Sequence, residues 1–193
     1  SAGVLIRNCE FIDNKSTIGA GLYADSAHNM EVIDSKFSDN VATKEGGGMF
    51  LSLTDNVLIT NAEFRDNRAV GVIGVESTLD GGKGGGLMID RGNKSLLLNS
   101  LFEGNRSFYG AGIYAKSSSD LAITNCLIYN NKTDEHTSGY GGGIYFNNPS
   151  NNKVTNCTLH NNLGQLGGQN IYASVGNIAD SLIVTNTILG PPS

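Results

Sequence analysis

Two short phrases alternate along this chain, and their repetition restricts what it can fold into. The first is a glycine-rich phrase that leads into an apolar residue, and its five copies begin at Gly19, Gly46, Gly84, Gly110 and Gly141. The second is Phe-x-x-Asn, whose four intact copies begin at Phe11, Phe37, Phe64 and Phe102. Periods of about 20 to 50 residues are typical of solenoids, in which each repeat packs on its neighbours. We therefore expect one continuous stack of repeats.

Aligning the repeats in columns predicts their secondary structure. With Asn8 as the anchor, the equivalent positions are Asp34, Asn61, Asn99, Asn125, Asn156 and Asn186. This alignment gives six coils and the start of a seventh. Apolar residues stand two positions before and three positions after the anchor in every coil, and apolar alternation recurs after the glycine phrase. A period of two indicates strands, so each coil is predicted to have three short strands.

Helical repeats fit this pattern poorly. Each glycine within a helix costs about 1 kcal/mol, and glycines recur in every copy of the first phrase. In a stack of parallel strands, by contrast, a polar residue that recurs at one bend can bond to its copies above and below. The columns of Asn8 and Asn14 fit such ladders. The predicted fold class is therefore all-β, a parallel solenoid of six to seven coils.

Composition agrees with a single domain over residues 1–193 and excludes some partners. The chain is 39% hydrophobic and 16% charged, with a net charge of -5. It contains no run of Lys or Arg that could follow a phosphate backbone, so we expect no nucleic-acid partner. It also contains no apolar run near the ~20 residues of a membrane span. Because the chain opens on Ser1-Ala2-Gly3 and enters a core strand by Val4, we expect a mature protein or an excised fragment.

The three cysteines share one column of small residues. Cys9, Cys126 and Cys157 align with serine, alanine and threonine in the other coils. Stacked strands in register point both side chains the same way, which suits the torsions of a disulfide poorly. We predict buried free thiols rather than a disulfide or metal site.

The alternating Gly-Gly-Ala-Ile-like and Phe-x-x-Asn phrases resemble the repeats of the chlamydial polymorphic outer membrane proteins and of other right-handed parallel β-helix surface proteins. The resemblance covers Val4 to Leu189. It implies a right-handed β-helix that is extracellular or at the cell surface. It also implies an adhesin-like or stalk-like part of a larger surface protein. Polysaccharide lyases, hydrolases and epimerases share this fold, so the fold alone does not settle activity.

Two insertions mark one edge of the expected solenoid. They span Ala69 to Lys83 and Asp134 to Tyr140, and a short aromatic turn lies between them. Raised loops beside a low aromatic turn would form a shallow cleft suited to a sugar ring or a peptide. The candidate ligand-binding residues are Arg106, Phe108, Tyr109, His136 and Tyr140. Alternatively, the apolar part of the first insertion covers the flank of the solenoid, and the aromatic turn packs against it.

Two further columns are candidate sites. Asp13, Asp39 and Asp66 would stack on successive coils, and carboxylates in such a row favour Ca²⁺. The alternative is that aspartate is simply a preferred turn residue, with nearby cations offsetting its charge. The other column should point outward by alternation, as a stabilising row or as a platform for a glycan or protein. Its members are Tyr23, Phe50, Met88, Tyr114, Tyr145 and Tyr172.

No catalytic group emerges from these columns. His28, His136 and His160 fall in different columns, and no Ser/His/Asp grouping can be drawn. We therefore favour a non-enzymatic adhesin or rigid stalk without a cofactor, whose partner is a host or neighbouring-cell surface protein or glycan. One alternative is a carbohydrate-active enzyme, similar to a polysaccharide lyase, or a carbohydrate-binding module. Another is a filament subunit that associates end to end, because the chain enters a core strand at Val4 without a capping helix.

Overall fold

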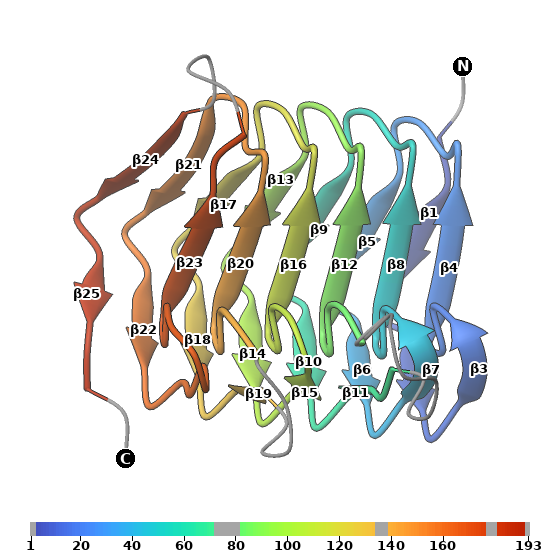
Figure 1. Cartoon of the computed structure of the whole chain (residues 1–193). Helices are drawn as coiled ribbons and strands as arrows, with labels where there is room; N and C mark the ends of the chain where they lie inside the picture. Colours follow the sequence, from blue (N-terminus) through green and yellow to red (C-terminus); the bar gives the residue numbers. More distant parts are fainter. Residues whose placement is uncertain (1–2, 72–81, 134–138, 177–180, 192–193) are drawn as a thin grey trace.

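The structure is a computed structural model that describes residues 3–71, 82–133, 139–176 and 181–191. Figure 1 shows the coils of the chain stacked side by side, with the N-terminus at one end of the stack and the C-terminus at the other. Four parallel sheets run along the stack, and each strand pairs with its equivalents in the neighbouring coils. The described residues contain strands and turns but no helix. The predicted all-β parallel solenoid is confirmed.

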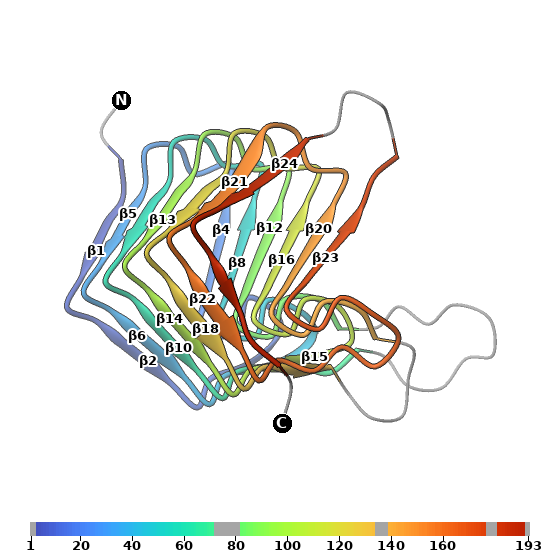
Figure 2. The same cartoon turned by 90° about the vertical axis from the view of Figure 1, so that its left-hand side faces the viewer.

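The first two sheets each contain seven strands. Sheet A consists of β1 (Leu5–Arg7), β5 (Glu31–Ile33), β9 (Leu58–Thr60), β13 (Leu96–Leu98), β17 (Ala122–Thr124), β21 (Asn152–Thr155) and β24 (Leu182–Thr185). Sheet B consists of β2 (Glu10–Ile12), β6 (Lys36–Ser38), β10 (Glu63–Arg65), β14 (Leu101–Glu103), β18 (Leu127–Tyr129), β22 (Thr158–His160) and β25 (Ile188–Leu189). The two sheets meet at a bend, and Figure 2 shows this bend repeated in every coil.

The other two sheets are smaller. Sheet C consists of β3 (Lys15–Ile18), β7 (Val41–Glu45), β11 (Arg68–Ala69), β15 (Arg106–Ser107) and β19 (Lys132–Thr133). Sheet D consists of β4 (Leu22–Asp25), β8 (Met49–Ser52), β12 (Leu87–Asp90), β16 (Ile113–Lys116), β20 (Ile144–Asn147) and β23 (Ile171–Ser174). The prediction of three strands per coil is therefore wrong for five coils, which add a fourth short strand in sheet C. That strand shrinks to two residues in three coils, too few to give a period-two pattern.

Left-handed backbone turns separate the strands. Asn8 and its equivalents, which lie between sheets A and B, have φ between 46° and 55°. Asp13, Asp39 and Asp66 lie at the next bend with φ of 52° to 58°. Asparagine and aspartate tolerate this conformation because their short polar side chains bond locally. Their recurrence in these two columns thus has a backbone cause.

The core is filled by the columns that the sequence placed inside. Four phenylalanines stack along the axis with centroid distances of 4.6 to 4.8 Å and interplanar angles of at most 6°. Phe37, Phe64 and Phe102 are fully buried. Aliphatic side chains of sheets A and D complete the same cluster. Each coil therefore contributes a similar layer, and the layers stack in register.

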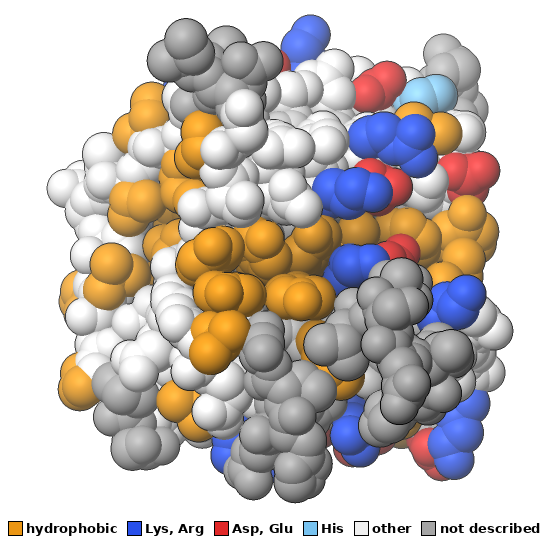
Figure 3. All heavy atoms as spheres, viewed as in Figure 1, with side chains coloured by type: hydrophobic (Ala, Val, Ile, Leu, Met, Phe, Trp, Pro, Cys, Tyr) orange, Lys and Arg blue, Asp and Glu red, His pale blue; other side chains and the backbone are white. Residues whose placement is uncertain are grey.

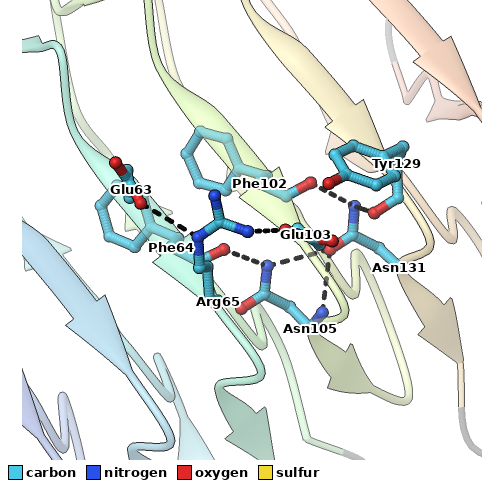
Figure 4. Close-up of polar contacts among 8 residues, drawn as sticks. All are labelled: Glu63, Phe64, Arg65, Phe102, Glu103, Asn105, Tyr129 and Asn131. Atoms are coloured by element: carbon cyan, nitrogen blue, oxygen red, sulfur yellow. Dashed lines mark hydrogen bonds and ion pairs between the residues drawn. The ribbon is translucent and has the colours of Figure 1, made fainter.

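A buried asparagine ladder runs beside the phenylalanines. Asn105 Oδ1 accepts hydrogen bonds from the backbone N and the Nδ2 of Asn67, and Asn105 Nδ2 donates to Asn131 Oδ1 and Phe64 O. Figure 4 shows two rungs of this ladder and, on the outer face of sheet B, Arg65 between Glu63 and Glu103. The ladder predicted for the Asn14 column is confirmed. The column of Asn8 is more exposed and has fewer such bonds, for example from Asn61 Nδ2 to Asp34 Oδ1.

The glycine phrase is required by close contact between coils. A Cβ on Gly86 would lie 2.6 Å from the carbonyl oxygen of Gly112 in the next coil, which no side chain can avoid. Gly84, two residues earlier, has a φ of +65°. Glycine tolerates both demands because it has no Cβ. The phrase therefore marks the turn that leads into sheet D.

The cysteines follow the prediction of free thiols. Cys126 and Cys157 are buried on adjacent coils, Cys9 is half-buried, and all three are free. The hydrogen bond with the Cys157 thiol and burial both raise the pKa of the Cys126 thiol. Cys126 is thus a protonated core residue.

Candidate functional site

The structure brings together two of the five residues predicted to bind a ligand. Tyr109 and Tyr140 pair across adjacent coils through a backbone bridge. Their rings are nearly parallel, at 7°, with centroids 6.4 Å apart. Phe108 is only 5% exposed, so its ring is not available to a ligand in the way that the cleft hypothesis requires. Arg106 is exposed on β15, and His136 lies outside the described residues.

The outward row on sheet D forms a second apolar cluster. Phe50, Met88 and Tyr114 are buried there, apart from the main core. Tyr23, at the N-terminal end of the row, is 46% exposed. Tyr109 and Tyr145 pack against the buried centre. The row therefore points away from the core, as alternation predicted; its centre is buried, whereas Tyr23 is exposed and Tyr145 and Tyr172 are half-buried.

A hollow of about 260 Å³ lies where the tyrosine pair meets this row. We call it the tyrosine hollow. Its lining consists of four aromatic and two polar side chains, namely Lys83, Tyr109, Tyr114, Tyr140, Tyr145 and Asn147. Tyr145 touches both groups, with ring centroids 5.9 Å from Tyr109 and 4.8 Å from Tyr114. Figure 3 shows the hydrophobic side chains gathered in a band across this face of the molecule.

Polar contacts fix the groups at the wall of the hollow. Asn147 Nδ2 donates to the Tyr114 hydroxyl at 2.9 Å. Lys83 Nζ lies 2.9 Å from Glu45 Oε1, and both side chains remain partly exposed. The charge of Lys83 is therefore matched by a carboxylate of the protein itself. This leaves aromatic surface as the main chemical feature of the hollow.

Burial raises the pKa of two of the tyrosines that line the hollow. Burial raises the pKa of Tyr114, against a smaller lowering effect of the Asn147 hydrogen bond. Burial and the neighbouring Tyr114 raise the pKa of Tyr145 to about 12. Neutral phenols can donate and accept hydrogen bonds while their ring faces pack against apolar groups. The hollow can thus bind a ligand that has both an apolar face and hydroxyl or amide groups.

The repeat alignment assigned the residues of the tyrosine hollow to separate predicted features. Tyr114 and Tyr145 belonged to the row on sheet D, whereas Lys83 and Asn147 were not singled out. A usable signal exists, because Lys83, Tyr109 and Tyr140 each stand directly before the first glycine of a glycine phrase. Ile18 and Tyr109 of that column pack against the row.

The aspartates predicted to bind calcium do not form a compact cluster. Asp13 and Asp39 each occupy a left-handed turn, and the Asp13 carboxylate is exposed, 3.9 Å from Lys15 Nζ. The carboxylate of Asp66 lies against Gly104, the equivalent residue in the next coil. Within the described ranges, no three His, Cys, Asp or Glu side chains are grouped so that they could hold a metal ion. The calcium site stays a prediction.

Comparison with known proteins identifies the family. In the part of the chain that the structure describes, no helix is long and apolar enough to cross a membrane. The chain is similar to the metabotropic glutamate receptor-like protein R of Dictyostelium discoideum, with 27% identity over 132 residues. That alignment covers 68% of this chain but only 7% of the receptor-like protein. The family model for the right handed beta helix region matches residues 1–188, and the chain therefore belongs to the right-handed β-helix family.

Proposed function

We propose that this chain is a non-enzymatic segment of an extracellular or cell-surface protein, and that it acts as a rigid adhesive surface. The observation that carries the proposal is the tyrosine hollow, in which four tyrosines surround an open space on the outside of the solenoid. Tyrosines are frequent in recognition sites because they supply large, rigid contact area with a polar tip. The partner is a glycan or protein of a host or neighbouring cell.

Two other observations support a surface location. The relative from Dictyostelium is named as receptor-like, and this chain resembles a small part of it. The repeats also resemble those of the chlamydial surface proteins. A parallel solenoid suits a stalk because every coil is fixed to its neighbours by backbone hydrogen bonds. A rigid support reduces the entropy lost when a ligand binds.

Binding of the labelled chain to arrays of glycans and of extracellular proteins tests the proposal. We expect at least one selective ligand, whose binding falls at least tenfold in the variants Tyr109→Ala and Tyr140→Ala. The matched control is Tyr129→Ala, which removes a tyrosine from the outer face of sheet B, where it stacks on His160. Unchanged binding in both hollow variants, with unchanged melting temperatures, would refute the proposal.

The same experiment separates the alternatives. A carbohydrate-active enzyme would release new unsaturated ends from an acidic polysaccharide, and this turnover would be lost in Arg106→Ala. For a filament subunit, the sedimentation coefficient measured by sedimentation velocity would increase with protein concentration. Either result without selective ligand binding would replace the adhesive function.

A further inference from the structure

The aromatic groups of the tyrosine hollow repeat along the solenoid axis. Tyr109 and Tyr140 occupy equivalent positions in adjacent coils. Tyr114, Tyr145 and Tyr172 do the same on β16, β20 and β23. Neighbouring parallel strands lie about 4.8 Å apart, so the half-buried rings of Tyr145 and Tyr172 follow the buried Tyr114 at about that spacing, with the Tyr145 and Tyr172 ring planes at 81° to each other. Figure 3 shows the resulting hydrophobic band crossing several strands of sheet D.

The ring surface also continues beyond the hollow. Tyr172 lies 4.5 Å from Tyr140 and 4.9 Å from Tyr145, measured between ring centroids. Tyr140, Tyr145 and Tyr172 are each half-buried, and Tyr145 packs against the buried centre of the row. A ligand longer than a single ring can therefore contact the tyrosines of more than one coil.

Charge in the hollow is balanced within the protein. Among the described residues of the lining, Lys83 is the charged one, and its Nζ lies 2.9 Å from Glu45 Oε1. An anionic ligand would have to displace Glu45 from Lys83 or place a second carboxylate beside it, and like charges at such a distance disfavour binding. An uncharged ligand can use the free hydrogen-bonding capacity of Asn147 and of the phenols without that cost.

We infer that the tyrosine hollow binds an uncharged oligosaccharide whose extended chain runs parallel to the solenoid axis. The inference rests on the adhesive function proposed above and names the ligand class of the same site. The C–H faces of successive sugar rings pack on the tyrosines of successive coils, and the sugar hydroxyls bond to Asn147, Lys83 and the phenols. In an extended oligosaccharide, each pyranose unit has a length close to the spacing of the coils. Successive sugars can therefore lie over successive coils.

Calorimetric titration of the full chain tests the inference. The probes are cello-, manno- and xylo-oligosaccharides of two to six sugars, and oligogalacturonate of six sugars. We expect at least one neutral series to bind, with affinity that rises with length. Tyr140→Ala and Tyr172→Ala should weaken the neutral hexasaccharide at least tenfold, and Tyr129→Ala should leave it unchanged. Oligogalacturonate should bind at least tenfold more weakly than the best neutral hexasaccharide.

Glu45→Gln gives a charge test that keeps the shape of the wall. This substitution removes the carboxylate that neutralises Lys83. The affinity for oligogalacturonate should therefore rise toward that for the neutral hexasaccharide, while the affinity for the neutral hexasaccharide should change little. Glu63→Gln is the matched control, because Glu63 pairs with Arg65 on sheet B, away from the hollow. Glu63→Gln should change neither the affinity for the neutral hexasaccharide nor the affinity for oligogalacturonate.

The outcomes distinguish this inference from the proposed function. Tighter binding of oligogalacturonate, abolished by Tyr140→Ala, overturns the uncharged ligand but keeps an adhesive hollow. Affinity that does not rise beyond a disaccharide overturns the axial chain. A protein ligand that depends on Tyr109 and Tyr140, with no carbohydrate binding, overturns the inference and keeps the proposed function. Binding that depends on none of these tyrosines overturns both.

Discussion

Replacing Asn105 by alanine tests whether the buried ladder stabilises the fold. The Asn105 side chain makes four hydrogen bonds, of which two are accepted from Asn67 and two are donated to Asn131 Oδ1 and Phe64 O. It is fully buried. A typical hydrogen bond contributes about 1 kcal/mol net, and its loss leaves buried partners unsatisfied. Asn105→Ala should therefore lower the free energy of unfolding by about 4 kcal/mol.

The same column contains a matched control at the end of the stack. Asn14 is exposed, and its side chain makes one hydrogen bond, from Nδ2 to Asn40 Oδ1 at 2.9 Å. Asn14→Ala should cost about 1 kcal/mol or less. The two variants delete the same atoms, so the difference between them measures what burial within the ladder adds.

Urea denaturation at 25 °C, followed by far-ultraviolet circular dichroism and tyrosine fluorescence, measures both losses. Coincident transitions from the two probes would show that the solenoid unfolds as one unit, which the comparison of free energies requires. Equal losses for Asn105→Ala and Asn14→Ala would refute the reasoning. In that case, water would have to form hydrogen bonds to the partners of Asn105 that are as favourable as those of the buried asparagine.

Three further predictions concern the core, the aspartates and the phenols. Phe64→Ala should destabilise the fold by about 3 to 5 kcal/mol, because the ring is fully buried between two others; a loss below 1 kcal/mol in urea titration would contradict the stacked core. If Asp13, Asp39 and Asp66 bind calcium, millimolar Ca²⁺ should raise the melting temperature and a chelator should reverse the rise; an unchanged curve leaves the turn explanation alone. The pKa of Tyr145 is raised to about 12, so the folded state holds this proton more tightly than the unfolded state, and stability should fall as pH rises from about 10 to about 12. Tyr145→Phe should make this decline shallower in denaturation at successive pH values.

The sequence alone determined the solenoid. The coil spacing, the phenylalanine column and the Asn14 column each placed residues correctly, because a stacked fold repeats the same local demands in every coil. Asn40, for example, must bond to Asn67 in the next coil, and the side chain that can do so recurs at every equivalent position. The free cysteines followed from the same column logic. The short strands of sheet C escaped prediction because two residues, such as Arg68–Ala69, show no alternation.

Only the tertiary structure decided how the candidate site is assembled. Tyr109 and Tyr140 belonged to the insertion edge, and Tyr114 and Tyr145 belonged to the row on sheet D. The left-handed turn at Gly110 brings Tyr109 close to Tyr114. The backbone of this turn packs tightly on Tyr114, because a Cβ at Gly110 would lie 2.8 Å from Cβ of Tyr114. The chain thus folds back over the outer face of sheet D, and the residue before the glycine comes to lie beside rings of the next coil. Alternation along a strand reports which face a residue takes but not what packs on that face, because the covering residues come from another coil.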